Sequence, residues 1–304
     1  MSSTSRPRRS SGSSRSATAS STSSSTGEAG LGAAEIRRLA ASHGVHPTKA
    51  LGQHFLIDPN LARWIAGATE AGAGDRVIEI GAGLGSLTLP LAATGAGVVA
   101  VEVDRRAASA LRDAAGDRVR VLEADAMALD WSATLGPGTD PWVLAGSLPY
   151  NIATPLVLDV LRDVPRIARV VVMVQREVAE RLAARPGEEG FGAVSLRVAY
   201  AAEATVLRRV GARVFWPAPS VGSAVVRLDR RPAPAVDVDP ERLWAVVDEA
   251  FAQRRKTMRN ALRRLGLDGA AADDLLGSCG VAPSARPEEL GLEAFAAIAR
   301  EVPA

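Results

Sequence analysis

The residues best suited to chemistry lie in one short segment, Gly146-Ser147-Leu148-Pro149-Tyr150-Asn151. Pro149 holds Leu148 in an extended conformation and has no N–H of its own, so the Leu148 carbonyl can point outward as an acceptor. The Ser147 hydroxyl is a second acceptor. The Tyr150 ring offers a flat face to a base, and such stacking contributes about 1–3 kcal/mol. Two acceptors and an aromatic face suit the exocyclic amine of a nucleobase.

The chemistry that this segment favours is methyl transfer to the amine. Adenine N6 is a poor nucleophile, because its lone pair is delocalised into the ring. Acceptors that stabilise the positive charge developing on nitrogen lower the barrier, and alignment of a methyl sulfonium with the amine lowers it further. The alternative interpretation is a proline turn that ends a strand. Methyl transfer is therefore favoured only if the chain also contains a nucleoside site.

A glycine-rich segment upstream supplies the first part of such a site, Glu79-Ile80-Gly81-Ala82-Gly83-Leu84-Gly85. Glycines after a buried strand let the backbone pass close under a ligand, and the following helix offers free N–H groups. Dinucleotide sites space their glycines two and then three residues apart. Here the spacings are two and two, and Ser86 occupies the third dinucleotide position. This favours a nucleoside without a pyrophosphate over a nicotinamide dehydrogenase site.

Acidic residues follow the next two predicted strands. Glu102 ends the second strand, where an acid accepts hydrogen bonds from ribose hydroxyls. Asp104, two residues later, is better interpreted as a helix cap. Asp125, followed by Ala126, comes after the third strand, where a carboxylate can accept the exocyclic amine of an adenine; a solvated loop acid is the alternative. Together with the glycines, these acids predict a nucleoside site.

The elements that must position these residues alternate between short apolar β-branched runs and helical patterns. This alternation predicts an α/β fold, a doubly wound Rossmann-like sheet of the class I methyltransferase kind. Two late runs predict a terminal antiparallel hairpin, and a proline-rich boundary at 231–234 precedes a small all-helical C-terminal domain. The predicted strands are 77–80, 98–101, 119–122, 142–145, 170–174, 204–210 and 223–229, and the predicted helices of the sheet domain are 86–93, 105–115, 154–162 and 175–185.

Composition and charge limit the class of protein. We expect residues 1–30, rich in serine and arginine, to form a disordered tail, with an RNA-binding arm as the alternative. The expected domains are then 31–231, which binds the methyl donor, and 235–304, which is helical. No apolar run reaches the roughly 18 residues of a membrane span. With one cysteine, Cys279, we expect a cytoplasmic protein without a metal site.

These motifs resemble those of the KsgA family, also called RsmA, the 16S rRNA adenine N6-dimethyltransferases. The resemblance covers residues from about 46 to 300. Residues 51–56, Leu-Gly-Gln-His-Phe-Leu, resemble the family's N-terminal motif, whose last residues contact the cofactor. Residues 215–221 resemble its aromatic-proline loop facing the target base. Residues 251–257, Phe-Ala-Gln-Arg-Arg-Lys-Thr, resemble the signature that opens its C-terminal domain.

The resemblance implies a cofactor, a substrate and a set of site residues. It implies S-adenosylmethionine as the cofactor and dimethylation of N6 on two adjacent adenosines in the 3′-terminal hairpin of 16S rRNA, within a small-subunit precursor. We expect the enzyme to act as a monomer. The catalytic residues would be Ser147, Leu148, Pro149, Tyr150 and Phe215. The cofactor site would contain Gln53, His54, Leu56, Glu79, Gly81, Gly83, Gly85, Glu102, Asp125, Ala126 and Ser147.

A basic segment helps to choose between related families. The Erm methyltransferases, which act on 23S rRNA, share the cofactor motifs but not this arginine-rich helix. Arg254, Arg255, Lys256 and Arg259 can face an RNA backbone, whereas a solvated basic face is the alternative for an isolated run. An Erm-like enzyme and an assembly factor with weak methylation remain alternative functions. The family usually has asparagine where this chain has Ser147, a shorter acceptor whose reach to N6 differs.

Overall fold

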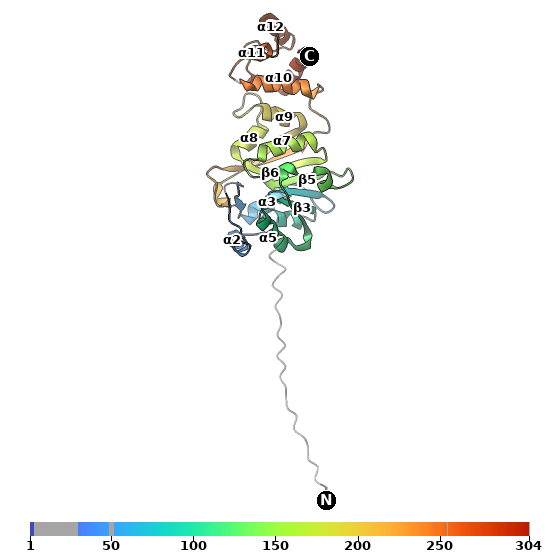
Figure 1. Ribbon diagram of the computed structural model, residues 1–304, viewed down its shortest axis with the longest axis vertical. Helices are drawn as coiled ribbons and strands as arrows, with labels where there is room; N and C mark the ends of the chain where they lie inside the picture. Colours follow the sequence, from blue (N-terminus) through green and yellow to red (C-terminus); the bar gives the residue numbers. More distant parts are fainter. Residues whose placement is uncertain (3–29, 49–51, 254, 304) are drawn as a thin grey trace.

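The computed structural model describes residues 1–2, 30–48, 52–253 and 255–303 (Figure 1). Most of the predicted tail, the first residue of the N-terminal motif (Leu51) and Arg254 therefore lie outside the described residues. Within the described ranges, no helix is both long enough and apolar enough to cross a membrane. No group of three or more His, Cys, Asp or Glu residues in these ranges is arranged to hold a metal ion.

A seven-stranded sheet forms the centre of the molecule, with the order β4-β3-β2-β5-β6-β9-β7. The first five strands in this order pair in parallel, and β9 pairs antiparallel with both β6 and β7. The predicted doubly wound sheet with a terminal antiparallel pair is confirmed. The strands are β2 (Arg76–Ile80), β3 (Gly97–Glu102), β4 (Val119–Glu123), β5 (Trp142–Ser147), β6 (Ile167–Gln175), β7 (Ala202–Val210) and β9 (Ser223–Arg230).

Helices cover both faces of this sheet, because buried parallel strands are apolar on both sides. On one face, helices α2 to α5 bury a core that includes Ile36, Ile65 and Leu111. On the other face, α7 and α8 bury Leu156, Val160 and other residues against the sheet. The helices are α2 (Ala33–Ser42), α3 (Pro59–Ala68), α4 (Thr88–Ala93), α5 (Arg105–Ala115), α6 (Trp131–Leu135), α7 (Ala153–Asp163) and α8 (Arg176–Ala183), with short 3-10 turns η1 (Gly116–Arg118), η2 (Ala126–Ala128) and η3 (Ala212–Val214).

The C-terminal helices have a core of their own, in which Phe295 is fully buried. Helix α9 (Ala193–Ala201) joins this core to the sheet domain, because Leu196 packs among the C-terminal helices and Val198 packs against the sheet side. The predicted helical C-terminal part is confirmed. It contains α10 (Pro240–Ala252), α11 (Met258–Arg264), α12 (Gly269–Ser278), η4 (Pro287–Glu289) and α13 (Leu292–Glu301).

Two strands of two residues form a second, small sheet that the sequence did not predict. β1 (Phe55–Leu56) pairs antiparallel with β8 (Phe215–Trp216), so Phe55 lies opposite Trp216 and Leu56 opposite Phe215. The Ile57 N–H continues this pairing by donating to the Val214 carbonyl at 2.8 Å. The small sheet holds the N-terminal motif against the aromatic-proline loop.

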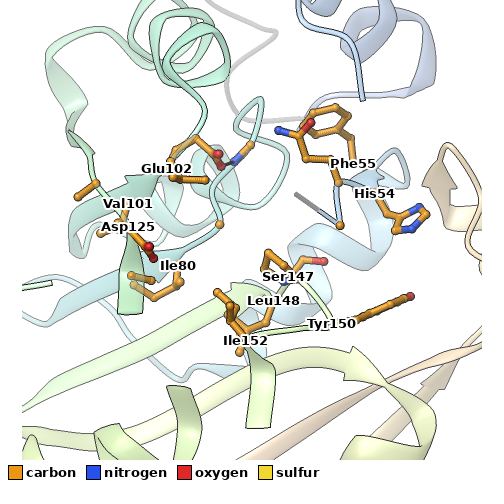
Figure 2. A pocket seen from close by; sticks show the side chains of 18 of the residues that line it. His54, Phe55, Ile80, Val101, Glu102, Asp125, Ser147, Leu148, Tyr150 and Ile152 are labelled. Atoms are coloured by element: carbon orange, nitrogen blue, oxygen red, sulfur yellow. Dashed lines mark hydrogen bonds between the residues drawn. The ribbon is translucent and has the colours of Figure 1, made fainter. Parts of the chain in front are cut away.

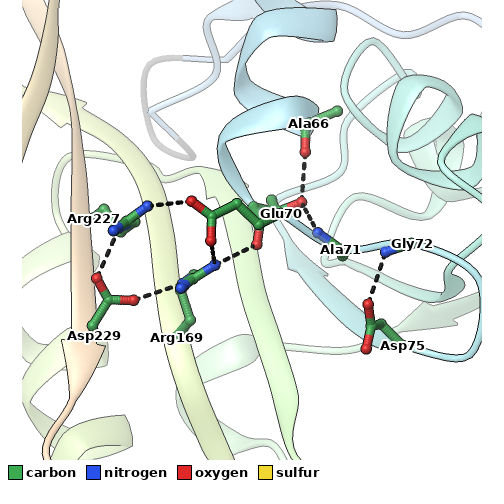
Figure 3. A network of polar contacts seen from close by, with 9 residues as sticks. Ala66, Glu70, Ala71, Gly72, Asp75, Arg169, Arg227 and Asp229 are labelled. Carbon is green, nitrogen blue, oxygen red and sulfur yellow. Dashed lines mark hydrogen bonds and ion pairs between the residues drawn. The ribbon is translucent and has the colours of Figure 1, made fainter.

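Figure 3 shows a network of ion pairs between the turn after α3 and two strands. It lies near the start of β6 and the end of β9, away from the carboxyl ends of the parallel strands. Arg169 of β6 and Arg227 of β9 each contact both Glu70 and Asp229, with N···O distances of 2.6–2.8 Å. Hydrogen bonding and charge from Arg169, and then from Arg227, lower the pKa of Glu70. The network ties the turn after α3 to the antiparallel part of the sheet.

Candidate active site

A pocket lies where the strand order reverses, between β2 and β5. In doubly wound sheets, ligands bind outside the carboxyl ends of the strands at such a point. Figure 2 shows Glu102 and Asp125 on one side of this pocket, and Tyr150 with His54 on the other. The lining residues are Gly52, Gln53, His54, Phe55, Ile80, Gly81, Gly83, Val101, Glu102, Val103, Ala124, Asp125, Ala126, Ser147, Leu148, Pro149, Tyr150, Ile152 and Phe215.

Two glycines after β2 form the floor of the pocket. Gly81 and Gly83 have φ values of 71° and 56°, in the left-handed region that favours glycine. A Cβ on Gly83 would lie 3.0 Å from a ring carbon of Phe55, and one on Gly81 would lie 3.4 Å from the ring of Pro149. The glycines therefore let this turn run directly beside the N-terminal motif and the Ser147–Tyr150 segment.

Glu102 is held rigidly at the end of β3, and its side chain reaches the pocket. One carboxylate oxygen accepts a hydrogen bond from the Gly83 N–H at 2.7 Å, and the other accepts one from the Asp104 N–H at 2.9 Å. Burial raises the pKa of Glu102, and these backbone donors oppose that shift. The structure thus positions an acceptor where the sequence predicted a ribose contact.

The N-terminal motif is anchored to α5 through Gln53. The Gln53 amide donates to Asp104 at 2.9 Å, and its carbonyl oxygen accepts from the Thr48 N–H at 3.1 Å. Asp104 also caps α5 by accepting from the N–H groups of Arg106 and Ala107. The predicted cap is therefore confirmed, and its second oxygen holds a residue that lines the pocket.

Asp125 and Ala126 form another wall of the pocket, after β4. One Asp125 oxygen accepts from the Met127 N–H at 2.9 Å and caps η2. Within the described part of the chain, its side chain makes no other hydrogen bond. The second oxygen can therefore accept from a ligand.

The Ser147–Tyr150 segment presents the two acceptors that the sequence predicted. The Leu148 N–H donates to the Met173 carbonyl at 3.0 Å, which fixes the segment at the end of β5. Among the described residues, no group donates to the Leu148 carbonyl, and the Ser147 hydroxyl has no partner. Both oxygens therefore keep acceptor capacity beside the pocket.

Tyr150 is held from two directions. Its hydroxyl lies 3.2 Å from the Ser223 hydroxyl of β9, and its ring stacks on His54 with centroids 5.7 Å apart. The His54 Nδ1 lies 2.7 Å from the Pro217 carbonyl, so in the tautomer that satisfies this contact it donates a hydrogen bond. Phe215 is 5% exposed and lines the same side. His54, predicted in the cofactor site, thus contacts the aromatic side of the pocket as well.

Three residues predicted in the cofactor site do not line the pocket. Leu56 is buried, and its carbonyl accepts from the Ser86 hydroxyl at 2.5 Å. Gly85 lies against Leu111, and a Cβ there would come within 2.7 Å of that side chain. Glu79 is 1% exposed in the sheet, and burial raises its pKa to about 8. These three residues belong to the buried structure around the glycine turn and not to the pocket lining.

The sequence did not predict several residues that line the pocket or hold Tyr150. Ile80 and Val101 near strand ends, and Ile152 just before α7, line the pocket, but apolar residues at such positions resemble core residues in a sequence. Ser223 is 1% exposed, and only the fold brings it to Tyr150. A β-strand serine carries no local signal for such a contact.

The predicted RNA-binding cations differ in their surroundings. Arg255 and Lys256 are exposed and form no ion pair with the described residues. Arg259 instead pairs with Asp273 at 2.7 Å and donates to the Gly269 carbonyl. Arg263, which was not predicted, is exposed on the same helix and has no ion pair within the described ranges.

Fold and site together define the class of protein. A glycine turn and two acids meet at the reversal point of a doubly wound sheet, beside an acceptor-rich proline–tyrosine segment. No lysine or arginine is among the described residues that line the pocket, so it offers no side-chain cation for a pyrophosphate. This is the arrangement of a Rossmann-like, nucleoside-binding methyltransferase.

The comparison with known families is more specific. Residues 46–302 match the family described as ribosomal RNA adenine dimethylase, and the chain belongs to this family. It is therefore an S-adenosylmethionine-dependent rRNA adenine methyltransferase. The residues of the pocket fit this cofactor, since the fixed Glu102 carboxylate suits ribose hydroxyls and the second Asp125 oxygen suits an adenine amine.

Several proteins are similar over most of the chain. The ribosomal RNA small subunit methyltransferase A of Thermobifida fusca is 47% identical, over 89% of this chain and 95% of that protein. Its counterpart from Streptomyces griseus is 45% identical, over 90% and 95%. Among solved structures, the 23S rRNA methyltransferase ErmE is 26% identical with a TM-score of 0.65, over 82% of this chain and 99% of that one. A Plasmodium falciparum dimethyladenosine transferase, 23% identical with a TM-score of 0.69 over 81% and 96%, shares the fold.

Proposed function

We propose that the enzyme dimethylates N6 of two adjacent adenosines in the 3′-terminal hairpin of 16S rRNA, within a precursor of the small ribosomal subunit. The observation that carries the reaction is the pair of acceptors at Ser147 and Leu148 beside the Tyr150 ring. Two relatives, at 47% and 45% identity, are small-subunit rRNA methyltransferases, which favours the small ribosomal subunit as the source of the substrate RNA.

The proposed roles around the cofactor follow from the fixed acceptors. Glu102, held by two backbone N–H groups, accepts hydrogen bonds from the ribose hydroxyls. Asp125 accepts from the adenine amine with its second oxygen. Ile80, Val101 and Ala126 supply the apolar walls. When bound, S-adenosylmethionine supplies an electrophilic methyl group.

The proposed roles around the target base follow from the opposite wall. The base is extruded from its stack to reach the pocket and lies against Tyr150, with Phe215 and His54 beside it. The Ser147 hydroxyl and the Leu148 carbonyl accept the hydrogens of N6. They would stabilise the positive charge that develops on nitrogen during methyl transfer. The methyl–sulfur bond would break as the nitrogen–methyl bond forms, the sulfonium would leave as a neutral thioether, and the nitrogen would lose its proton to water.

The proposed division of labour assigns transfer to residues 31–231 and RNA contact to residues 235–304. Arg255 and Lys256 are exposed cations on the second part. Arg259 is bound to Asp273 and connects α11 to α12, so we assign it a positioning role there. We further propose that the enzyme acts as a monomer in the cytoplasm.

Two other functions remain open to test. The likeness to ErmE, at a TM-score of 0.65, favours an Erm-like reaction on 23S rRNA as the second candidate. An assembly factor with weak methylation is the third, because Ser147 is a short acceptor.

One experiment separates the three functions. Purified enzyme is incubated with labelled S-adenosylmethionine and either immature small subunits or large subunits. Mass spectrometry of the nucleosides identifies the product, and primer extension maps the modified positions. We expect dimethyladenosine at two adjacent positions near the 3′ end of 16S rRNA. Modification of 23S rRNA alone, or tight binding with no turnover, would refute the proposal.

A further inference from the structure

Arginines lie over tryptophan rings at four places in the described part of the chain, and these pairs differ in what else they contact. In two of them the arginine also forms an ion pair with an aspartate, which neutralises much of its charge. Such a pair combines packing with a salt bridge and has little capacity left for an anion. These two are Arg76 over Trp142 with Asp140, and Arg197 over Trp244 with Asp248.

The other two pairs contain a guanidinium without a carboxylate partner among the described residues. The Arg37 guanidinium carbon lies 5.9 Å from the centroid of the Trp216 ring, and that of Arg208 lies 5.1 Å from Trp64. Both arginines are exposed. A guanidinium packed on a ring is held in place while its N–H donors stay available. These two cations are therefore positioned but not neutralised.

The first of these pairs lies beside the pocket. Trp216 follows Phe215, which lines the pocket, and it pairs with Phe55 across the small sheet of β1 and β8. Arg37 comes from α2, on the same side of the molecule. An RNA strand that enters the pocket past Phe215 would therefore pass close to the Arg37 guanidinium.

The second pair extends the same surface to the edge strand β7. Arg208 lies on β7, and Trp64 of α3 is 36% exposed. The segment 204–222, which runs from β7 to the pocket, contains three arginines and no aspartate or glutamate, and one of the three, Arg209, pairs with Glu180 at 2.9 Å. Its third arginine, Arg213, is exposed and has no ion pair with a described residue. Arg37, Arg213 and Arg208, none of which has a described carboxylate partner, thus lie on elements that lead from the pocket to the sheet edge.

We infer that this surface, the arginine–tryptophan strip of Arg37, Trp216, Arg213, Arg208 and Trp64, binds the phosphate backbone of the RNA strand that leads into the pocket. The inference deepens the proposed function and rests on it. A polyanionic strand suits cations spaced along a surface, and guanidinium groups bind phosphate oxygens in a bidentate manner. Because the rings already order the arginines, binding loses less side-chain entropy.

The strip is tested with a double variant and a matched control. Arg37→Ala with Arg208→Ala removes both packed cations. Arg112→Ala with Arg120→Ala removes two exposed arginines, also without described ion pairs, from α5 and the opposite edge strand β4. Binding of a synthetic RNA hairpin with two adjacent adenosines is measured by fluorescence anisotropy over a series of KCl concentrations. Methylation of immature small subunits gives kcat and KM.

We expect the strip variant to bind the hairpin about tenfold more weakly, and its slope of log K against log salt to decrease by about two. Its KM should rise while kcat and the affinity for S-adenosylmethionine stay at wild-type values. The control variant should match the wild type. Arg37→Gln with Arg208→Gln, which keeps side chains on the rings, should reproduce the loss if the alanine variant is poorly folded.

Wild-type affinity and salt slope in the strip variants, or equal weakening in the control, would overturn the inference. A loss of kcat without a change in hairpin affinity would also overturn it. The wild-type enzyme could bind the hairpin with a salt slope about two units steeper than that of the strip variant and yet transfer no methyl group to adenine. That result would refute the proposed function and leave the inference about RNA binding by the strip intact. The two conclusions are therefore separable.

Discussion

At the scale of single residues, the proposed reaction depends on two acceptors that no described residue occupies. The Ser147 hydroxyl and the Leu148 carbonyl accept no hydrogen bond from the described residues, yet Leu148 is 2% exposed and fixed through its N–H. Acceptors that are immobile before the substrate arrives need little reorganisation during the reaction. Tyr150 is similarly held, by Ser223 and His54.

Tyr150→Ala should reduce kcat/KM for rRNA by about 5- to 150-fold, because stacking on a base contributes about 1–3 kcal/mol. Affinity for S-adenosylmethionine, measured by calorimetry, should change little. Tyr150→Phe is the matched control: it keeps the ring and loses only the contact with Ser223. Equal activity of the alanine variant and the wild type would contradict the stacking role.

Glu79→Gln tests the buried carboxyl beneath the glycine turn. Burial raises the Glu79 pKa from its ordinary 4.5 to about 8. Between these values the unfolded chain is ionised while the folded protein keeps the proton, so this group reduces stability as pH rises through that window. Urea unfolding should show the variant more stable than wild type at pH 8, by a few kcal/mol, on the order of 1.4 kcal/mol per unit of pKa shift. At pH 4.5 the difference should be much smaller. A constant difference across this range would show that Glu79 is ionised in the fold.

At the scale of elements, the small sheet of β1 and β8 completes the pocket. It consists of two residues on each strand, yet it joins segments about 160 residues apart, as the contact between His54 and Pro217 shows. The glycine turn after β2 fits beneath it, because Gly83 lies directly against Phe55. The proposed cofactor site and the proposed base site therefore share one boundary.

Gly83→Ala should weaken binding of S-adenosylmethionine by tenfold or more. The new methyl group would lie 3.0 Å from the Phe55 ring, and alanine at a φ of 56° adds roughly 1–2 kcal/mol of strain. Gly116→Ala separates these effects, since Gly116 has a φ of 59° but nothing within 4 Å. Calorimetric titration should show normal affinity in that control. If both variants bind equally well, steric fit at Gly83 does not control the site.

At the scale of the whole molecule, two hydrophobic cores meet at α9. Leu196 belongs to the C-terminal core and Val198 to the sheet domain, so the C-terminal helices are held directly against the catalytic part. This contact gives the exposed cations of the C-terminal part a defined position relative to the pocket. The RNA contacts that we propose on the two parts can then act on one substrate.

Replacing Arg255 and Lys256 together with alanine should raise KM for immature small subunits and reduce the salt slope of RNA binding by about two, with kcat unchanged. Arg259→Ala should behave differently, since its partner is Asp273. We expect a lower melting temperature for that variant, with a smaller effect on the salt slope. Identical salt slopes for the double variant and the wild type would exclude these cations from RNA contact.

Most of the sheet could be predicted from the sequence, because each strand is a short apolar run between turn residues. The pocket residues Gly81, Glu102, Asp125 and Ser147 could be predicted as well, since each lies directly at the end of such a strand and parallel strands end at one edge. Helix α9 was missed because it is buried on two sides and has no clear amphipathic period.

The fold class, the order of the motifs and the reaction that they favour can be predicted from the amino-acid sequence, because these depend on local periodicity and on residues adjoining strand ends. Which side chains contact one another follows only from the three-dimensional fold. It placed His54 on Tyr150, bound Arg259 to Asp273, and left Arg37 on Trp216 without a described carboxylate. Such contacts join residues far apart in the chain, and no local pattern encodes the distance between them.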